Sequence, residues 1–248
     1  MLKKKLLVVA LASAFSLPAL AGDHTVTGNV GFVTDYIFRG IAQTSHQPAV
    51  QGGIDYTHSS GLYAGVWGSN VSWIGDSGAV ASGSVTMELD TYAGFRNTVM
   101  EDVGYDVGYV RFNYLGDYTA TAGFAKADTH ELYGSASYKF LSAKYSYSLG
   151  DFLTVIDAKG TSYIEVNANY TLADSGLMLG AHAGKQTFKP SSASIYTYTD
   201  YKLSVAKDFS GYVVGLAYTS TNAGPAWTYA TGDKWGKGVV ALSVLHSM

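Results

Sequence analysis

The stretch VTGNVGFVTDYIFR, residues 26–39, alternates apolar and polar side chains. Successive side chains of a β-strand point to opposite faces, so this period of two predicts a strand with one apolar and one polar face. The apolar face would carry Val26, Val30, Phe32, Tyr36 and Phe38, and the polar face Thr27, Asn29, Asp35 and Arg39. Similar alternation recurs along the chain, which predicts a large sheet with one apolar face and one polar face.

Twelve such strands are expected in all. Their predicted ranges are 25–39, 48–58, 61–73, 85–96, 104–115, 129–140, 142–149, 161–172, 176–187, 197–208, 211–221 and 237–248. Short Gly-, Asp- and Ser-rich turns alternate with longer polar connections at 40–47, 74–84, 116–128, 150–160, 188–196 and 222–236, while 97–103 is a longer turn. This arrangement predicts an all-β fold, a transmembrane antiparallel up-and-down β-barrel of about 12 strands, formed by residues 22–248 as one domain.

The N-terminus resembles an export signal. Lys3, Lys4 and Lys5 precede an apolar run, and Pro18 precedes a small-x-small cleavage site that ends at Ala21. We therefore expect residues 1–21 to be a cleaved signal peptide. Its removal takes three positive charges from a net charge of −3, which leaves −6 on the exported chain.

The composition and the motifs of the chain argue against several classes of function. The chain has no cysteine, so we expect the sheet to hold the fold without disulfides. A negative net charge without a basic patch argues against a nucleic-acid partner. The segment Gly75-Asp76-Ser77-Gly78 resembles a serine-protease string, but no positioned histidine accompanies it. The histidines show no metal-ligand spacing, so the sequence predicts no enzyme, metal or cofactor.

The polar face would line the interior of the barrel, because a charge on the lipid face is costly. The candidate pore-lining residues are Asp35, Arg39, Asp55, Glu88, Asp90, Arg96, Arg111, Glu131, Lys144, Glu165, Asp200 and Lys202. A barrel of 12 strands is intermediate in width, so these charges either line a narrow pore or close it by pairing with one another.

Aromatic residues cluster near the predicted strand ends. Amphipathic rings prefer the level of lipid headgroups, which predicts two girdles. The outer candidates are Phe38, Trp73, Tyr114, Tyr163, Tyr198 and Tyr218, and the inner candidates are Tyr56, Tyr63, Phe95, Tyr138, Tyr170 and Tyr212. The alternative is that tyrosine is simply favoured in strands.

Three early segments carry a family resemblance: NVGFVTDYIFRGIAQT (29–44), PAVQGGIDY (48–56) and GLYAGVWGSNV (61–71). Later echoes are ELD (88–90), KYSYS (144–148), YTDY (198–201) and LAYT (216–219). The chain resembles the TorF family of proposed porins (Gcw_chp) over nearly its whole exported length. The resemblance implies an outer-membrane barrel and offers no settled binding residues. One departure is Met248, where outer-membrane strands often end on an aromatic ring that the assembly machinery reads.

The leading hypothesis is an outer-membrane porin that passes small hydrophilic solutes or ions by diffusion. Its other expected partners are outer-membrane lipid and the assembly machinery, after export through the periplasm of a Gram-negative bacterium. Two alternatives remain open: a closed barrel that acts as a structural or adhesive surface protein through its loops, and a soluble periplasmic β-sandwich.

Overall fold

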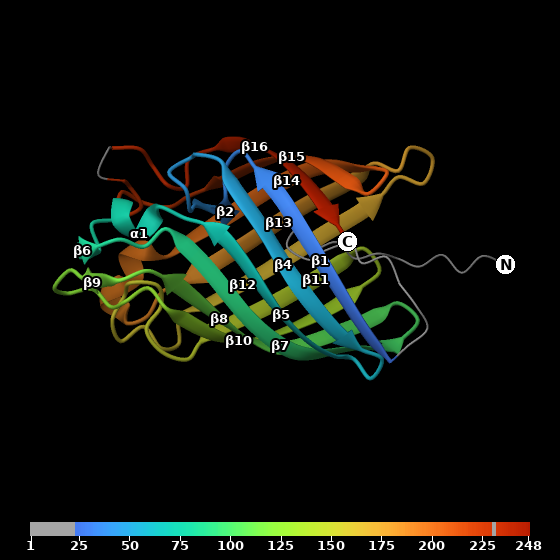
Figure 1. The fold of residues 1–248 in the computed structure, drawn as a ribbon, viewed down its shortest axis with the longest axis horizontal. Coiled ribbons are helices and arrows are strands. Elements are labelled where there is room, and N and C mark those ends of the chain that lie inside the picture. Colours follow the sequence, from blue (N-terminus) through green and yellow to red (C-terminus); the bar gives the residue numbers. More distant parts are fainter. Residues whose placement is uncertain (1–22, 230–231) are drawn as a thin grey trace.

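A computed structural model describes residues 23–229 and 232–248. Within these ranges twelve antiparallel strands hydrogen-bond into one closed ring, in the order β1-β16-β15-β14-β13-β12-β11-β10-β8-β7-β5-β4 (Figure 1). The predicted fold class is confirmed. The predicted β-sandwich alternative is wrong, because a single ring replaces two facing sheets. The predicted signal peptide lies outside the described residues.

The ring strands match the twelve predicted ranges closely. They are β1 (His24–Val33), β4 (Ala49–His58), β5 (Leu62–Asn70), β7 (Met87–Met100), β8 (Val103–Leu115), β10 (Thr129–Tyr138), β11 (Leu141–Ser148), β12 (Ser162–Thr171), β13 (Met178–Thr187), β14 (Tyr198–Phe209), β15 (Tyr212–Thr221) and β16 (Val239–Ser247). Two boundaries differ. β1 ends at Val33 rather than at residue 39, and β7 and β8 extend so far that only residues 101–102 connect them.

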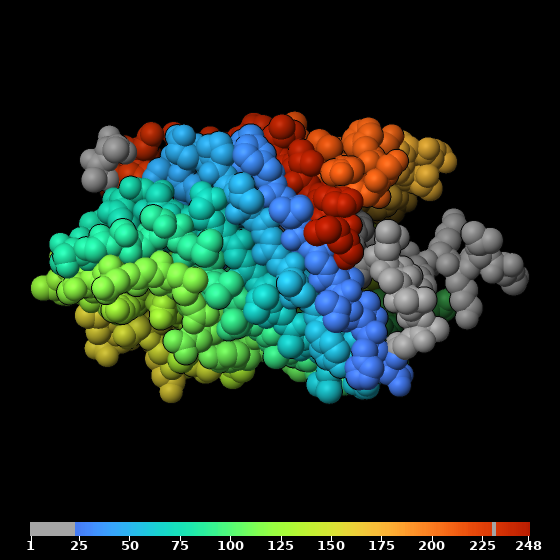
Figure 2. Space-filling model, in the orientation of Figure 1, coloured from blue at the N-terminus to red at the C-terminus, as the bar shows by residue number. Residues whose placement is uncertain are grey.

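The first and last strands close the ring. β1 pairs with β16 from Asn29↔Ser247 to Val33↔Ser243, and the backbones of Gly28 and Met248 exchange two hydrogen bonds of 2.9 and 2.8 Å. In the space-filling view the blue N-terminal strand and the red C-terminal strand lie side by side (Figure 2). The seam is closed from Gly28 to Thr34, as a sheet that sits in lipid requires, while residues 24–27 of β1 pair with β4 alone among the described residues.

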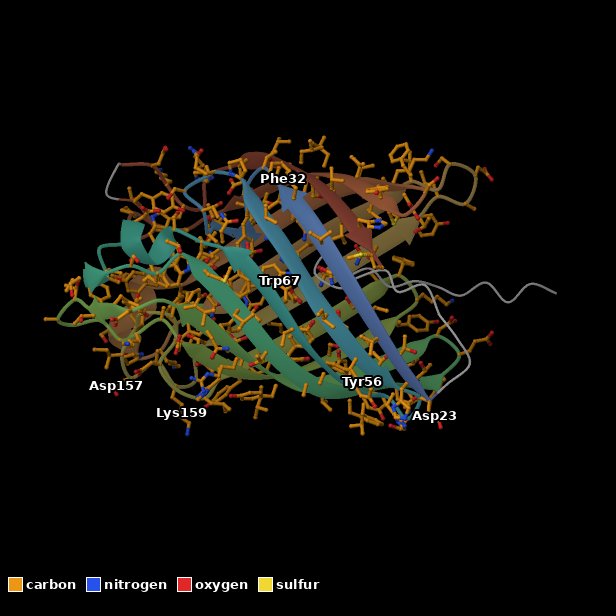
Figure 3. All side chains as sticks on the ribbon, in the orientation of Figure 1. Asp23, Phe32, Tyr56, Trp67, Asp157 and Lys159 are labelled. Carbon is orange, nitrogen blue, oxygen red and sulfur yellow. The ribbon has the colours of Figure 1, made fainter. Side chains whose placement is uncertain are left out.

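The two ends of the barrel differ. Short connections join the strands at one end, called here the turn end, and long connections gather at the other, called the loop end (Figure 1). Asp23 lies at the turn end, and Asp157 and Lys159 lie at the loop end (Figure 3). The predicted alternation of short and long connections is therefore found in the structure.

The exterior of the ring is apolar. Large side chains on the outward positions are exposed on strands all around the barrel, among them Val26, Ile54, Val66, Leu132, Ile164, Val166, Leu203, Leu216 and Val240. Soluble monomers rarely expose apolar patches of such extent. The outward charges Arg111, Lys185 and Lys207 lie near strand ends, so the middle of the exterior belt stays uncharged. A lipid bilayer suits this surface.

The long connections fold over the loop end instead of standing away from it. They contain β2 (Ile37–Phe38), β3 (Ile41–Ala42), α1 (Trp73–Asp76), β6 (Val80–Gly83), β9 (Tyr118–Ala120) and the 3-10 helix η1 (Ser191–Tyr196). Their side chains build a hydrophobic cluster, called here the loop core, with inward residues at the strand ends. Its large members are Tyr36, Ile41, Trp73, Ile74, Phe112, Tyr114, Tyr118, Phe152, Phe188, Tyr198, Trp227, Tyr229 and Trp235. Burial of this cluster holds the loops together across the mouth of the barrel.

Candidate functional site: the barrel interior

Burial of the inward side chains changes along the barrel axis. On β14, Tyr198 and Asp200 near the loop end are buried, while Lys202 and Ser204 nearer the turn end are half-buried. The same change occurs on β7, where Glu88 and Asp90 are buried and Arg96 is exposed. On β10, β11, β12 and β13, too, the inward side chains are more buried near the loop end than near the turn end. The interior is therefore a polar vestibule that solvent reaches from the turn end and that the loop core covers at the loop end.

A small hairpin lies under the loop core. The chain leaves β1 at Val33 and turns inward, and β2 and β3 pair through Ile37↔Ala42 and Phe38↔Ile41. Arg39 and Gly40 form the two-residue tip, with φ angles of 48° and 79°. Positive φ at both positions is the geometry of a type I′ turn, which suits glycine but strains an arginine. The fold thus holds Arg39 at the tip of a hairpin that enters the barrel.

The Arg39 guanidinium crosses to a distant wall. Nη1 and Nη2 donate to the two carboxylate oxygens of Glu131 at 2.9 and 2.6 Å, and Nη1 also donates to Gln186 Oε1 at 3.0 Å. Counted through β4, β5, β7 and β8, the Glu131 strand β10 is the fifth from β1 in the ring of 12. Paired hydrogen bonds of this type are strong and directional, and they fix the hairpin across the lumen.

Aromatic rings complete the surroundings of this guanidinium. Its central carbon lies 4.4 Å from the Tyr163 ring centroid, 4.8 Å from that of Phe38 and 6.0 Å from that of Phe152. Each distance is within the range of a cation–π attraction, which strengthens away from water. The Arg39 side chain is only 9% exposed and that of Glu131 only 1%. Charge pairing and stacking together allow this cation to be buried.

A second network lies beside Arg39. The Tyr163 hydroxyl donates to Asp200 Oδ2 at 2.9 Å, and His182 Nε2 lies 2.9 Å from Asp200 Oδ1. The other ring nitrogen, His182 Nδ1, lies 2.7 Å from Asn167 Oδ1. These side chains come from β12, β13 and β14, so the network ties three neighbouring strands together below the loop core.

The turn half of the interior holds mixed charges. The Tyr63 hydroxyl donates to Asp106 Oδ1 at 2.7 Å and also contacts the Tyr133 hydroxyl. The central guanidinium carbon of Arg96 lies 5.0 Å from the Tyr63 ring centroid, and Lys144 Nζ lies 4.1 Å from the Tyr133 ring centroid. A further tyrosine, Tyr92, donates to Asp55 Oδ1 at 2.6 Å. Acids and bases are balanced here.

The loop half of the interior is acidic by contrast. Glu88, Asp90, Glu131 and Asp200 are all buried there, and Arg39 is the cation paired among them. Glu88 Oε2 and Asp90 Oδ1 have no hydrogen-bond partner among the described residues. A buried carboxylate oxygen without a partner carries a desolvation cost, which a bound proton or a nearby cation would relieve.

A further acid lies within the loops themselves. Asp35 Oδ2 is 2.6 Å from His46 Nδ1, and His46 Nε2 is 3.1 Å from the Lys234 carbonyl oxygen. Burial raises the pKa of Asp35, and its hydrogen bond to His46 opposes that rise. This contact connects the segment after β1 to the long connection before β16.

Nine sequence-predicted pore residues face the interior from ring strands: Asp55, Glu88, Asp90, Arg96, Glu131, Lys144, Glu165, Asp200 and Lys202. Two come from a different element than predicted, because β1 ends early: Arg39 enters on the hairpin tip, and Asp35 lies among the loops. The interior placement of Arg111 is wrong. It is exposed on the outer face near the loop end, 3.7 Å from Asp128, where a charge near the interface is tolerated.

The aromatic candidates divide between the two faces. Tyr56, Phe95, Tyr138, Tyr170, Tyr212 and Tyr218 lie on outward positions. Girdle positions predicted for Phe38, Tyr63, Trp73, Tyr114, Tyr163 and Tyr198 are wrong, because these side chains point inward or pack in the loop core. Two exposed outward tyrosines near the loop end, Tyr147 and Tyr201, were missed, although alternation from the inward Ser146 and Asp200 places both outside.

The protease-like string spans the end of α1 and the turn that follows it. Ser77 donates its hydroxyl to the Ile74 carbonyl at 2.8 Å, and Asp76 accepts a hydrogen bond from Ser45. Among residues 23–229 and 232–248, no three His, Cys, Asp or Glu side chains group as metal ligands. No helix in those ranges is long and apolar enough to cross a membrane.

Comparison with solved structures gives the fold. The KdgM porin in complex with disordered oligogalacturonate has a TM-score of 0.54 at 6% identity, over 90% of this chain and 99% of that one. A TodX monoaromatic hydrocarbon channel mutant scores 0.49 at 11% identity over 92% and 90%, and Salmonella typhi OmpF with daunomycin scores 0.43 at 12% identity over 91% and 97%. No curated protein matches the chain.

A family model adds the relationship in sequence. The model described as a bacterial protein of unknown function (Gcw_chp) matches residues 19–247, which is nearly the whole chain. The early segments that carried the resemblance, including the one that forms the inward hairpin, fall within that match. The protein therefore belongs to the Gcw_chp family.

Proposed function

We propose that this chain is an outer-membrane channel of the porin type that passes small hydrophilic solutes or ions by diffusion. The observation that carries the proposal is the contrast between the two faces of one closed sheet: an apolar exterior surrounds a vestibule lined with charges. Packing alone does not require charged side chains in the interior, since apolar side chains could fill the same space without the cost of desolvating ions. The KdgM likeness supports the architecture.

In this proposal the turn end faces the periplasm and the loop end faces outward, as in bacterial outer-membrane barrels generally. The structure then represents a closed state, because the loop core and the hairpin β2–β3 cover the loop end. Conduction requires the hairpin tip to leave its place beside Glu131 and Gln186. The lumen would select by width and by charge, with no energy coupling.

One observation favours a second function, a closed barrel that acts through its loops as a structural or adhesive surface protein. The packing of the loop core around Trp73, Trp227 and Trp235 gives the outward-facing end an ordered surface. The two functions differ in whether the barrel conducts, and a flux measurement separates them.

The experiment has two parts. The exported chain should fractionate with the outer membrane and should migrate differently on gels before and after boiling, because a closed sheet resists detergent until it is heated. Liposomes that contain the refolded chain should then take up a small neutral sugar or amino acid faster than empty liposomes. Release by a carbonate wash contradicts the membrane location. A heat-shifting barrel that admits no solute, even as Arg39→Ala, contradicts the channel and supports the loop-displaying alternative.

A further inference from the structure

The surroundings of the Arg39 guanidinium have the composition of a ligand site. Along its edge the guanidinium donates two hydrogen bonds to Glu131 and one to Gln186. One flat face of the cation lies against the Tyr163 ring. We call Glu131, Gln186, Tyr163 and Phe152 the cage. Carboxylate forks and aromatic faces are the groups that recognise guanidinium in proteins.

The cage is independent of the hairpin that fills it. Glu131 lies on β10, Gln186 on β13 and Tyr163 on β12, and Phe152 lies in the connection between β11 and β12. Gln186 is held by its own hydrogen bond to the Ser162 carbonyl at 3.1 Å, and Tyr163 by Asp200. Glu131, Gln186 and Tyr163 stay in place when the hairpin withdraws, since the strands that carry them belong to the ring.

An empty cage would attract a cation strongly. Without Arg39, the carboxylate of Glu131 would be buried and unpaired in a zone that already contains Glu88, Asp90 and Asp200. Two oxygens in that zone, Glu88 Oε2 and Asp90 Oδ1, already lack partners among the described residues. Because water is excluded there, a bound cation would be stabilised more than it would be at an exposed site.

The hairpin occupies the cage under strain. Arg39 adopts a φ of 48°, which an L-residue with a long side chain rarely adopts. Two hydrogen bonds to the backbone of Ala42 hold the base of the hairpin: Ala42 N donates to the Trp235 carbonyl at 3.0 Å, and the Tyr229 hydroxyl donates to the Ala42 carbonyl at 2.8 Å. Withdrawal of the strained tip from the cage would break both of these hydrogen bonds and expose Ala42, so Ala42 reports on the displacement.

We infer that the cage is a binding site for solutes that carry a guanidinium group, and that Arg39 fills it as an internal ligand in the closed barrel. A solute guanidinium that reaches Glu131 competes with Arg39, and its binding favours the withdrawn hairpin. Because the solute and Arg39 compete for the same cage, binding of the solute and opening of the barrel are coupled. The opening part of this inference rests on the proposed channel function, whereas binding to the cage does not.

The first test removes the internal ligand. Arg39→Ala should bind guanidinium ion, measured as a rise in thermal unfolding temperature between 0 and 20 mM guanidinium chloride against sodium chloride of equal ionic strength. The double variant with Glu131→Gln should bind at least about tenfold more weakly, because a charge-assisted pair is lost. Lys159→Ala, which removes an exposed loop cation, should respond like the unmodified chain. Equal responses in all four proteins contradict the cage.

A second measurement uses the chain with Arg39 intact. The protein contains no cysteine, so Ala42→Cys places a single thiol on β3, at a position that is 0% exposed. Methylguanidinium should accelerate the reaction of this thiol with a maleimide several-fold, and methylammonium should do so less, because it lacks the planar fork. An equal rate with both cations, or no change with either, contradicts displacement of the hairpin.

The two failures are distinguishable. If Arg39→Ala binds guanidinium but no barrel conducts, the cage stands and the channel function falls. If the barrel conducts while neither measurement detects guanidinium, the channel stands and this inference falls. Binding and labelling are both measured on the folded barrel in detergent, so neither result depends on flux.

Discussion

Arg39 and Glu131 join opposite parts of the barrel by two hydrogen bonds of 2.9 and 2.6 Å, although 92 residues separate them in the chain. Arg39 sits on a hairpin tip and Glu131 on the wall, so the pair fastens the inward segment to the ring. Both side chains are nearly inaccessible to solvent. This contact holds the hairpin tip against the wall of the barrel below the loop core.

Removal of one partner of this pair should destabilise the barrel. Arg39→Ala leaves a buried carboxylate unpaired, and Glu131→Gln leaves a buried guanidinium without its counter-charge. Either change should lower the free energy of unfolding by about 3–5 kcal/mol, measured by urea titration in lipid vesicles. Lys159→Ala is the matched charge-loss control and should change it by less than about 0.5 kcal/mol. Equal stability of Glu131→Gln and the control would mean that the pair does not fasten the hairpin.

The fit of the hairpin tip can be tested without a change of charge. A Cβ atom at Gly40 would lie 2.5 Å from Asp200 Cβ and 2.5 Å from Thr221 Cγ2, whereas one at Gly78 would meet nothing within 4 Å. Both glycines have positive φ, at 79° and 76°, so alanine strains both backbones alike. Gly40→Ala should therefore push the tip out of the lumen, and Gly78→Ala should not.

The reaction rate of the thiol in Ala42→Cys measures how readily the tip is displaced in each variant. This thiol should react about tenfold faster with maleimide in Gly40→Ala than in Gly78→Ala, which corresponds to a local opening made easier by about 1.4 kcal/mol. If the two backgrounds give the same rate, the tip does not fit the lumen as tightly as these distances require.

The orientation of β12 leads to a third prediction. Val166 is 53% exposed on the outer face, while Asn167 points inward and contacts His182. Val166→Arg places a charge in lipid and Asn167→Arg places it in the polar vestibule. Val166→Arg should cost roughly 2–4 kcal/mol more in a quantitative folding assay in vesicles. Equal costs would show that the outer face of β12 does not contact lipid.

Cation preference is the fourth prediction. Acids outnumber bases in the loop half of the interior, so an open channel should pass cations more readily than anions. Neutralisation of two of these acids, as Glu88→Gln with Asp90→Asn, should lower the permeability ratio measured by reversal potential under a salt gradient. The preference should weaken as salt increases and the Debye length falls from ~10 Å at 0.1 M to ~3 Å at 1 M.

Glu101→Gln provides the control for that measurement. Glu101 is exposed in the turn between β7 and β8, so its loss removes one acid without altering the loop half. Its permeability ratio should equal that of the unmodified chain. An anion-selective channel, or a ratio that responds equally to both sets of changes, would place the selective charges elsewhere.

Alternation predicted the ring because each strand has one face in an apolar and one in a polar environment. The same rule places Tyr163 inside with Glu165, and Tyr198 inside with Asp200. At these two positions strand parity outweighs the general preference of tyrosine for membrane interfaces. Arg111 shows the reverse error, because the rule that charges stay inside weakens near strand ends, where a side chain can reach water.

The closed loop end could not be predicted in this way. Phe38, Arg39 and Trp73 lie beyond the strand ends, where no period constrains the direction of a side chain. Arg39-Gly40 is also not among the dipeptides that mark a type I′ hairpin, so the inward turn carried no local signal. Its conformation depends on contacts with Glu131 and Gln186, which are 92 and 147 residues away in the chain.

Single-channel recording of the unmodified chain and Arg39→Ala, side by side in planar bilayers, tests the central claim most directly. The claim is that a polar passage crosses this barrel and that the Arg39 hairpin closes it. The unmodified chain should show low conductance with brief openings, and Arg39→Ala should show sustained openings of several-fold greater conductance. Lys159→Ala should match the unmodified chain. Absence of conductance in Arg39→Ala, in a preparation whose heat-modifiable migration shows a folded barrel, would contradict the claim.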